Sequence, residues 1–323
     1  MLAIQATAPG GPEVLKIADL PIPDPGPGQI RVKHAAIGLN FIDTYQRSGL
    51  YPIKLPAVLG QEAAGVVEAV GAGVTRFRAG DRVAYAGGAA AYAEANVVPA
   101  DRAVRLPDDI SFETAAAALL KGMTAEFLLR RCYAVQPGDA VLVHAAAGGV
   151  GGILTQWGKA LGGHVIGAVG SPAKAEVARA QGCESVILYR TEDVAARVKA
   201  LTDGQGVRVV YDGVGADTQE ASLASLGRRG VLICFGNASG PAPAVEPLRL
   251  MRGGSLFMTR PTLYDYVVTT EELDASAAAL FHVIETGAVK VAIGQTFPLS
   301  EARRAHEALE ARETTGATLL IPR

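Results

Sequence analysis

A cluster of glycines stands where an apolar strand would give way to a helix. The segment VLVHA (141–145) leads toward Gly148, Gly149, Val150 and Gly151, and the helical pattern GILTQWGKALG follows. A backbone without Cβ atoms approaches a pyrophosphate closely, and the first turn of a helix offers it free N–H groups. The glycines do not have the G-x-G-x-x-G spacing that is common in dinucleotide-binding proteins. The prediction therefore depends on their position between a strand and a helix. We predict a dinucleotide-binding turn; a tight turn without a ligand is the alternative.

The acid that usually binds the ribose of NAD is missing from the second strand. That strand, HVIGAVG, ends at Gly170 and is followed by Ser171 and, three residues later, Lys174. A carboxylate at this position would accept the 2′-hydroxyl of NAD and repel a 2′-phosphate. Tyr189 and Arg190 close the third strand nearby. We therefore predict NADP(H) rather than NAD(H); an ordinary solvated helix lysine is the alternative for Lys174.

The elements that position these residues alternate between apolar strand and amphipathic helix from about residue 140. The expected helices lie near 150–161, 172–181, 191–202 and 217–227, and the strands are AVLVHA, HVIGAV, SVILY, VRVVYD, GVLICFG and SLFMT. Continuous Val/Ile-rich strands that alternate with helices are typical of a parallel sheet covered on both faces. Six strands fit two βαβαβ halves, so we predict an α/β, doubly wound Rossmann domain.

The rest of the chain predicts a second, β-rich domain. Residues 1 to about 120 contain short β-prone segments between Gly/Pro turns, which indicates an antiparallel, barrel-like domain. After Thr259 come expected helices around 271–286 and 300–311 and a last strand, TLLIP, which no longer follow the parallel alternation. We predict that this stretch returns to the first domain. The expected boundaries are 1–122, 123–258 and 259–323, with a cleft between the domains.

Composition narrows the class of protein. The 323 residues carry 30 Lys plus Arg and 32 Asp plus Glu, a net charge of −2, so general nucleic-acid binding is not expected. We find no run of 18 uncharged apolar residues and no secretory signal, so no membrane association is expected. The three cysteines, Cys132, Cys183 and Cys234, are too few and too widely spaced for a disulfide framework. They predict a protein of the reducing cytoplasm.

Several motifs in order resemble the medium-chain dehydrogenase/reductase superfamily. Its G-x-E-x-x-G core corresponds to Gly60, Glu62 and Gly65, within VLGQEAAGVVEAVGAGVTRFRAGDRV. The segments HAAAGGVG, NFIDTYQRSGLYP (40–52) and FGNASG (235–240) resemble its quinone oxidoreductase branch, which includes zeta-crystallin. The resemblance covers essentially the whole chain. It implies a GroES-like domain plus a Rossmann domain, a homodimer and NADPH as cofactor.

The chain departs from the zinc alcohol dehydrogenases of that superfamily. Asn40 stands near the place of a cysteine ligand, and Gly60-Gln61-Glu62 replaces Gly-His-Glu. Glutamine is a poor zinc ligand, and none of the five histidines lies in a Cys/His cluster. We therefore predict no metal. Reduction of an acceptor that is already electrophilic needs no Lewis acid, because the cofactor delivers the hydride.

The resemblance also suggests the site residues. Asn40, Tyr45 and Tyr51, in a segment expected to be a loop facing the nicotinamide, are the candidate catalytic residues, and Gln61 and Lys121 are expected to line the pocket. The candidate cofactor-binding residues are Asn40, Phe41, Ile42, Asp43, Tyr45, Thr124, Phe127, Gly148, Gly149, Val150, Gly151, Gly170, Ser171, Lys174, Tyr189, Phe235, Gly236, Asn237, Arg260 and Arg312.

Three functions remain open from the sequence. The first is a zinc-free NADPH:quinone oxidoreductase acting on a small-molecule quinone in the cleft. The second is a 2-alkenal or enone reductase on the same scaffold. The third is a non-catalytic NADPH-binding protein, crystallin-like or RNA-binding, against which the absence of a basic patch argues.

Overall fold

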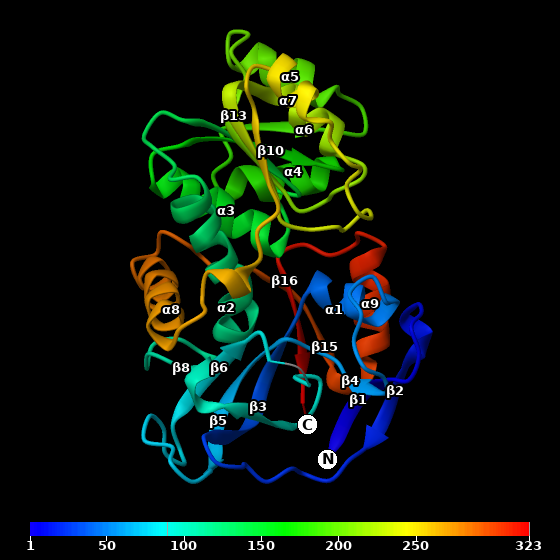
Figure 1. The fold of residues 1–323 in the computed structure, drawn as a ribbon, viewed down its shortest axis with the longest axis vertical. Coiled ribbons are helices and arrows are strands. Elements are labelled where there is room, and N and C mark those ends of the chain that lie inside the picture. Colours follow the sequence, from blue (N-terminus) through cyan, green and yellow to red (C-terminus); the bar gives the residue numbers. More distant parts are fainter. Residues whose placement is uncertain (89, 323) are drawn as a thin grey trace. The chain divides into compact units, whose positions relative to one another are not determined.

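The computed structural model describes residues 1–88 and 90–322, and the chain divides into two compact units (Figure 1). Unit 1 comprises Met1–Met123, Val267–Glu285 and Val291–Arg323, and unit 2 comprises Thr124–Tyr266 and Thr286–Lys290. Unit 1 is built mainly on antiparallel β-sheet and unit 2 on a parallel sheet with helices. The predicted fold class, a GroES-like β domain plus a Rossmann domain, is confirmed.

Unit 2 contains a six-stranded sheet in the order β11-β10-β9-β12-β13-β14, with every neighbouring pair parallel. Its core is aliphatic, because the strands present Leu142, Ile166, Val210 and Leu232 to the covering helices. The strand order reverses between β9 and β12, the switch point at which such sheets bind ligands. The strands are β9 (Ala140–His144), β10 (His164–Val169), β11 (Ser185–Leu188), β12 (Val207–Asp212), β13 (Leu226–Cys234) and β14 (Phe257–Thr259).

The helices of unit 2 follow the predicted alternation, with one addition. The short α7 (Pro247–Arg252) was not expected; it buries none of its residues, so no apolar periodicity indicates it, and Pro247 in its first turn is its one local signal. The other elements are the end of α2 (Phe112–Phe127), η3 (Leu128–Cys132), α3 (Gly149–Ala160), α4 (Pro172–Ala180), α5 (Val194–Leu201) and α6 (Gln219–Ser225).

Unit 1 contains a seven-stranded sheet and a three-stranded sheet. The last strand of the chain pairs antiparallel with the third, with Thr318 opposite Leu39, so the C-terminal segment extends the N-terminal sheet. The order of the smaller sheet is β2-β1-β4, and that of the larger is β15-β16-β3-β5-β6-β8 with β7 beside β3. The strands are β1 (Leu2–Ala6), β2 (Leu15–Asp19), β3 (Gln29–Leu39), β4 (Ala57–Val58), β5 (Glu62–Val70), β6 (Arg82–Ala86), β7 (Ala95–Pro99), β8 (Ala103–Arg105), β15 (Ile293–Pro298) and β16 (Ala317–Ile321).

Helices surround these sheets. Ser111 caps α2, since its hydroxyl accepts the Thr114 N–H at 3.1 Å. The remaining helical elements of unit 1 are η1 (Pro12–Val14), α1 (Phe41–Ser48), η2 (Ala100–Arg102), α8 (Thr270–Glu285), η5 (Leu299–Glu301) and α9 (Ala302–Glu310), and η4 (Leu263–Asp265) belongs to unit 2. In the described part of the chain, every helix is too short or too polar to span a bilayer.

The segment 41–48, expected to be a loop, is the helix α1. It begins at the N-cap Asn40 with a capping box to Asp43 and ends at Gly49, whose φ of 84° places it in the left-handed region. Its polar residues Asp43, Thr44 and Arg47 are buried. Because this helix turns charged side chains inward, the apolar periodicity used to predict helices misses it. The capping box Asn40-x-x-Asp43 was the local signal that indicated a helix start.

Candidate functional site

The glycine turn lies at the carboxyl end of β9. Ala145 adopts φ 51°, a left-handed conformation that reverses the chain after the strand. Gly148 is the N-cap of α3, and its N–H is hydrogen-bonded to the Ala145 carbonyl at 2.8 Å. A Cβ on Gly151 would lie 2.2 Å from the same carbonyl oxygen, so only glycine fits there. The first turn of α3 therefore presents its N–H groups at a switch point of the sheet.

Polar side chains lie around Gly170 at the end of β10. A Cβ on Gly170 would meet the Tyr189 hydroxyl at 2.5 Å and the Arg190 Nε at 3.4 Å, so both groups lie over this glycine. Ser171 is the N-cap of α4, and its hydroxyl accepts the Lys174 N–H. The structure thus brings together Gly170, Ser171 and Tyr189, three of the four residues predicted around a 2′-phosphate, with Arg190 beside them; the fourth, Lys174, follows in the first turn of α4. Donors predominate in this group, which suits a phosphate.

The segment Phe235–Asn237 follows β13 and lies beside the loop after β12. The Phe235 N–H donates to the Asp212 carbonyl at 2.8 Å, and a Cβ on Gly236 would lie 2.3 Å from the Gly213 carbonyl oxygen. This close backbone approach places three predicted residues at the carboxyl edge of the sheet. Arg260, just beyond β14, is exposed and donates to the Pro261 carbonyl. Their contacts with a cofactor stay a prediction.

His144, beside the glycine turn, belongs to a buried polar network. Its Nε2 and the Ser222 hydroxyl are 2.9 Å apart, and that hydroxyl donates to Asp212 Oδ2 at 2.7 Å. The other Asp212 oxygen accepts the N–H groups of Val214 and Gly215, which follow β12. Burial lowers the pKa of His144. The network holds the loop after β12, so His144 has a structural role in this unit.

In unit 1, Asn40 and Lys121 meet at the buried carboxylate of Glu62. Oε2 of Glu62 accepts from the Asn40 side-chain amide at 2.8 Å and from the Lys121 ammonium at 3.0 Å. Oε1 accepts the Leu120 N–H at 2.6 Å. Glu62 is 0 % exposed and needs every one of these donors. The sequence reasoning used Glu62 only as a motif marker and missed this pairing.

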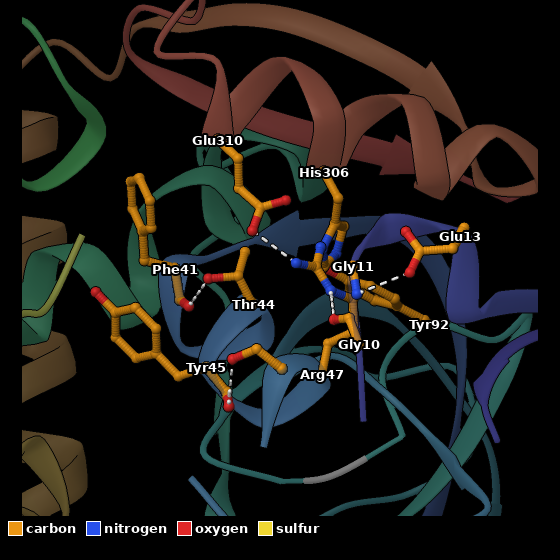
Figure 2. Close-up of polar contacts among 11 residues, drawn as sticks. Gly10, Gly11, Glu13, Phe41, Thr44, Tyr45, Arg47, Tyr92, His306 and Glu310 are labelled. Atoms are coloured by element: carbon orange, nitrogen blue, oxygen red, sulfur yellow. Dashed lines mark hydrogen bonds and ion pairs between the residues drawn. The ribbon is translucent and has the colours of Figure 1, made fainter. Parts of the chain in front are cut away.

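An aromatic row follows α1. The rings of Phe41 and Tyr45 lie 6.3 Å apart, and those of Tyr45 and Tyr51 meet edge to face at 5.2 Å. Figure 2 shows Phe41 and Tyr45 on the same side of the helix. The Tyr51 N–H donates to the Tyr45 carbonyl at 2.9 Å, which holds Tyr51 against the end of α1. The structure thus brings together Tyr45 and Tyr51, two of the three candidate catalytic residues, beside the helix that Asn40 begins.

Other predicted residues lie in varied surroundings. Ile42 is partly buried in α1, Thr124 is partly buried in α2, and Arg312 is exposed just after α9. Phe127 is 1 % exposed and its ring stacks on Tyr266 at 4.4 Å. Their roles toward a cofactor stay predictions.

The donor set in unit 1 does not fit zinc. The Glu62 carboxylate is saturated by an amide, a backbone N–H and the Lys121 ammonium, which already neutralises its charge. The Gln61 side chain donates to Gln46 Oε1 at 3.1 Å. Zinc prefers thiolate, imidazole and carboxylate ligands, and within residues 1–88 and 90–322 no three His, Cys, Asp or Glu side chains cluster suitably. A lysine ammonium thus provides the positive charge beside Glu62.

Comparison with known proteins places the chain in a family. Residues 26–108 match the alcohol dehydrogenase GroES-like domain, and residues 149–282 match the zinc-binding dehydrogenase family. The chain is 54 % identical to a quinone oxidoreductase of Pseudomonas aeruginosa over 99 % of both chains. The chain belongs to the quinone oxidoreductase family. This confirms the resemblance noted in the sequence to the medium-chain dehydrogenase/reductase superfamily.

Two further relatives bear on the chemistry of the quinone oxidoreductase family. The crystal structure of Escherichia coli quinone oxidoreductase complexed with NADPH is 50 % identical and superposes with a TM-score of 0.98 over 100 % of both chains. A 2-haloacrylate reductase from a Burkholderia species is 42 % identical over 97 % of this chain and 96 % of its own. The family thus includes enzymes named for two kinds of electron-poor acceptor.

Proposed function

We propose that this protein is an NADPH-dependent quinone oxidoreductase that works without zinc. The observation that carries the proposal is the full-length likeness to quinone oxidoreductases, one of them solved with NADPH. The groups around Gly170 support the choice of NADPH, because they include hydroxyls and a guanidinium, and the sequence has no carboxylate where NAD-binding proteins place one. When bound, NADPH would supply two electrons and one proton, which with a second proton from solvent reduce a quinone to a hydroquinone.

The residues of the chain would bind and orient the reactants. We propose that the α3 N-terminus, with Gly148, Gly149, Val150 and Gly151, receives the pyrophosphate, and that Ser171, Lys174 and Tyr189 receive the 2′-phosphate. Asn40, Tyr45 and Tyr51 are proposed to orient the acceptor, with a Tyr hydroxyl as hydrogen-bond donor to a quinone oxygen that gains charge. Three free thiols, two of them buried, support a location in the reducing cytoplasm.

Turnover of two acceptors tests the function. The purified chain is expected to oxidise NADPH faster with 1,4-benzoquinone than with an α,β-unsaturated ketone at equal concentration, and to prefer NADPH to NADH. Turnover is expected to survive dialysis against a zinc chelator. A faster rate with the unsaturated ketone would favour the second candidate, an activated-alkene reductase, which the Burkholderia relative supports. NADPH binding without turnover of either acceptor would contradict both.

Replacing Gly151 by Ala is expected to weaken NADPH and NADH binding about equally, by roughly tenfold or more. The added Cβ would lie 2.2 Å from the Ala145 carbonyl oxygen, so the turn that carries the α3 N–H groups must shift. Nucleotide titration followed by fluorescence measures the loss. Gly158→Ala in the same helix is the control, because its Cβ would meet side chains at an ordinary 3.4 Å. Unchanged affinity in Gly151→Ala would contradict the assigned turn.

We propose a homodimer that forms through β14. This strand is at one edge of the six-stranded sheet, and Phe257 on it is 61 % exposed, with Leu248 and Met251 of α7 also exposed. An exposed, apolar edge strand is a template for pairing with a second copy. Phe257→Lys is therefore expected to convert the dimer to monomers in sedimentation velocity. Ile17→Lys is the control, since Ile17 is 62 % exposed on the edge strand β2; dissociation by this change instead would contradict the proposal.

A further inference from the structure

A line of buried polar side chains leads from α9 to the beginning of α1. Figure 2 shows the Arg47 guanidinium enclosed by the Gly10 carbonyl and by His306 and Glu310 of α9. Arg47 is 2 % exposed; it donates from Nε to Gly10 at 3.0 Å, from one terminal nitrogen to Glu310 at 2.6 Å and from the other to His306 Nδ1 at 2.9 Å. A buried guanidinium with three such partners holds α1 and α9 together.

The hydrogen bonds along this line have one direction. A guanidinium only donates, so His306 Nδ1 accepts and the imidazole proton is on Nε2. That N–H donates to the Tyr92 hydroxyl oxygen at 3.0 Å, and the Tyr92 hydroxyl donates to Asp43 Oδ2 at 2.8 Å. Burial and the Arg47 charge lower the pKa of His306 to about 3, and burial raises the pKa of Tyr92 well above its usual range. Both groups stay neutral near pH 7, so Tyr92 stays a donor to Asp43.

Asp43 accepts the hydrogen bond of the Tyr92 hydroxyl and also that of the Asn40 backbone. Its Oδ2 accepts the Asn40 backbone N–H at 2.9 Å, while its buried Oδ1 has no hydrogen-bond partner among the described residues. Burial raises the pKa of Asp43 to about 7, against the opposing hydrogen bonds of Asn40 and Tyr92 and the Lys121 charge; the Glu62 charge adds to the rise. Both protonation states of Asp43 are therefore populated near neutral pH.

Two carboxylates thus hold one residue by different atoms. Glu62 binds the side-chain amide of Asn40, and Asp43 binds its backbone N–H. An ionised carboxylate is a stronger acceptor than a carboxylic acid, so protonation of Asp43 loosens the start of α1. We propose that Asp43 is a positioning residue for Asn40, and that the chain Arg47–His306–Tyr92 maintains it as an acceptor by presenting one fixed hydroxyl proton. The proposal rests on the proposed function, in which Asn40 orients the acceptor.

The pH profile of turnover tests the proposal. In the unchanged protein, kcat with 1,4-benzoquinone is expected to rise with pH through one titration near 7 as Asp43 ionises. Tyr92→Phe removes a donor that favours the ionised form, so the midpoint is expected to move upward by about one pH unit. The KM for NADPH is expected to stay within twofold. Asp43→Asn keeps an oxygen that accepts from the Asn40 N–H and the Tyr92 hydroxyl, but its amide cannot titrate. The rise of kcat with pH near 7, which we call the limb of the profile, is therefore expected to disappear.

Tyr85→Phe is the matched control. Tyr85 is also a buried tyrosine bonded to a histidine, but it donates to His34 Nε2 and accepts from Asn96, and no carboxylate of residues 1–88 and 90–322 is hydrogen-bonded to it. Both variants lose one buried hydroxyl, and only Tyr92→Phe is expected to move the midpoint. Coincident profiles for the two variants, or a limb that persists in Asp43→Asn, would overturn the proposal.

A measurement without turnover separates this proposal from the proposed function. The Asp43 carboxyl ¹³C resonance is identified by its loss in Asp43→Asn. Its chemical shift is expected to titrate with a midpoint near pH 7, and this midpoint is expected to move to higher pH in Tyr92→Phe. If the protein reduces no quinone but this titration is observed, the proposed function fails and the Tyr92–Asp43 link stands. If quinone is reduced and the carboxyl titrates near pH 4 in both proteins, the positioning proposal fails alone.

Discussion

Replacing Ser171 by Asp is expected to weaken NADPH binding by about a hundredfold and to strengthen NADH binding. Ser171 caps α4 beside Gly170, Tyr189 and Arg190, and Asp is an equally good N-cap, so the local fold is expected to persist. A carboxylate here would lie against the proposed 2′-phosphate, where two like charges a few ångströms apart repel by several kcal/mol at the effective dielectric of a protein surface. The same carboxylate would accept the 2′-hydroxyl of NADH. Calorimetric titration with each nucleotide measures both affinities.

Ser171→Asn separates charge from shape in this experiment. Asparagine has the size of aspartate and also caps helices, but it brings no charge. NADPH affinity is therefore expected to fall by less than tenfold. An equal loss of affinity for both nucleotides in Ser171→Asp, or an equal loss of NADPH affinity in the two variants, would show that the residues around Gly170 do not receive the phosphate.

Replacing Lys121 by Met is expected to lower the free energy of unfolding by about 3–5 kcal/mol. The Lys121 side chain is 6 % exposed and that of Glu62 is 0 % exposed, so the change leaves a buried carboxylate without its counter-charge. The Asn40 amide and the Leu120 N–H remain on Glu62, but they do not neutralise it. Chemical denaturation of the whole chain, followed by circular dichroism, measures the loss.

The double variant Lys121→Met with Glu62→Gln tests whether the unpaired charge is the cause. Removing both charges is expected to recover most of the lost stability, because no charge is left unpaired in the core and the glutamine oxygen still accepts the Leu120 N–H. The exposed pair Arg303–Glu307 provides the control, and Arg303→Met is expected to cost less than about 0.5 kcal/mol. Additive losses from the two buried changes would contradict the role given to this pair.

The chemistry of unit 1 could be predicted only in part from sequence. Asn40, Tyr45 and Tyr51 came from the resemblance, and the structure places all three on or beside α1. That α1 is a helix was missed, since Asp43 and Arg47 point inward and break the apolar pattern. The partners of Arg47 could not be predicted either, because His306 follows it by 259 positions and no local sequence pattern links the two residues.

The fold of unit 2 could be predicted largely from local patterns in the sequence. Its six strands and the helices α3 to α6 follow from short-range patterns, since continuous Val/Ile runs and helical periodicity are local properties of the chain. The glycine turn and the missing acid after β10 are local as well. Only the tertiary structure decided which distant groups become the partners of the buried charges: Lys121 of Glu62, Tyr92 of Asp43, and His306 of Arg47. Burial makes every charge depend on a partner, and folding brings that partner from any distance along the chain.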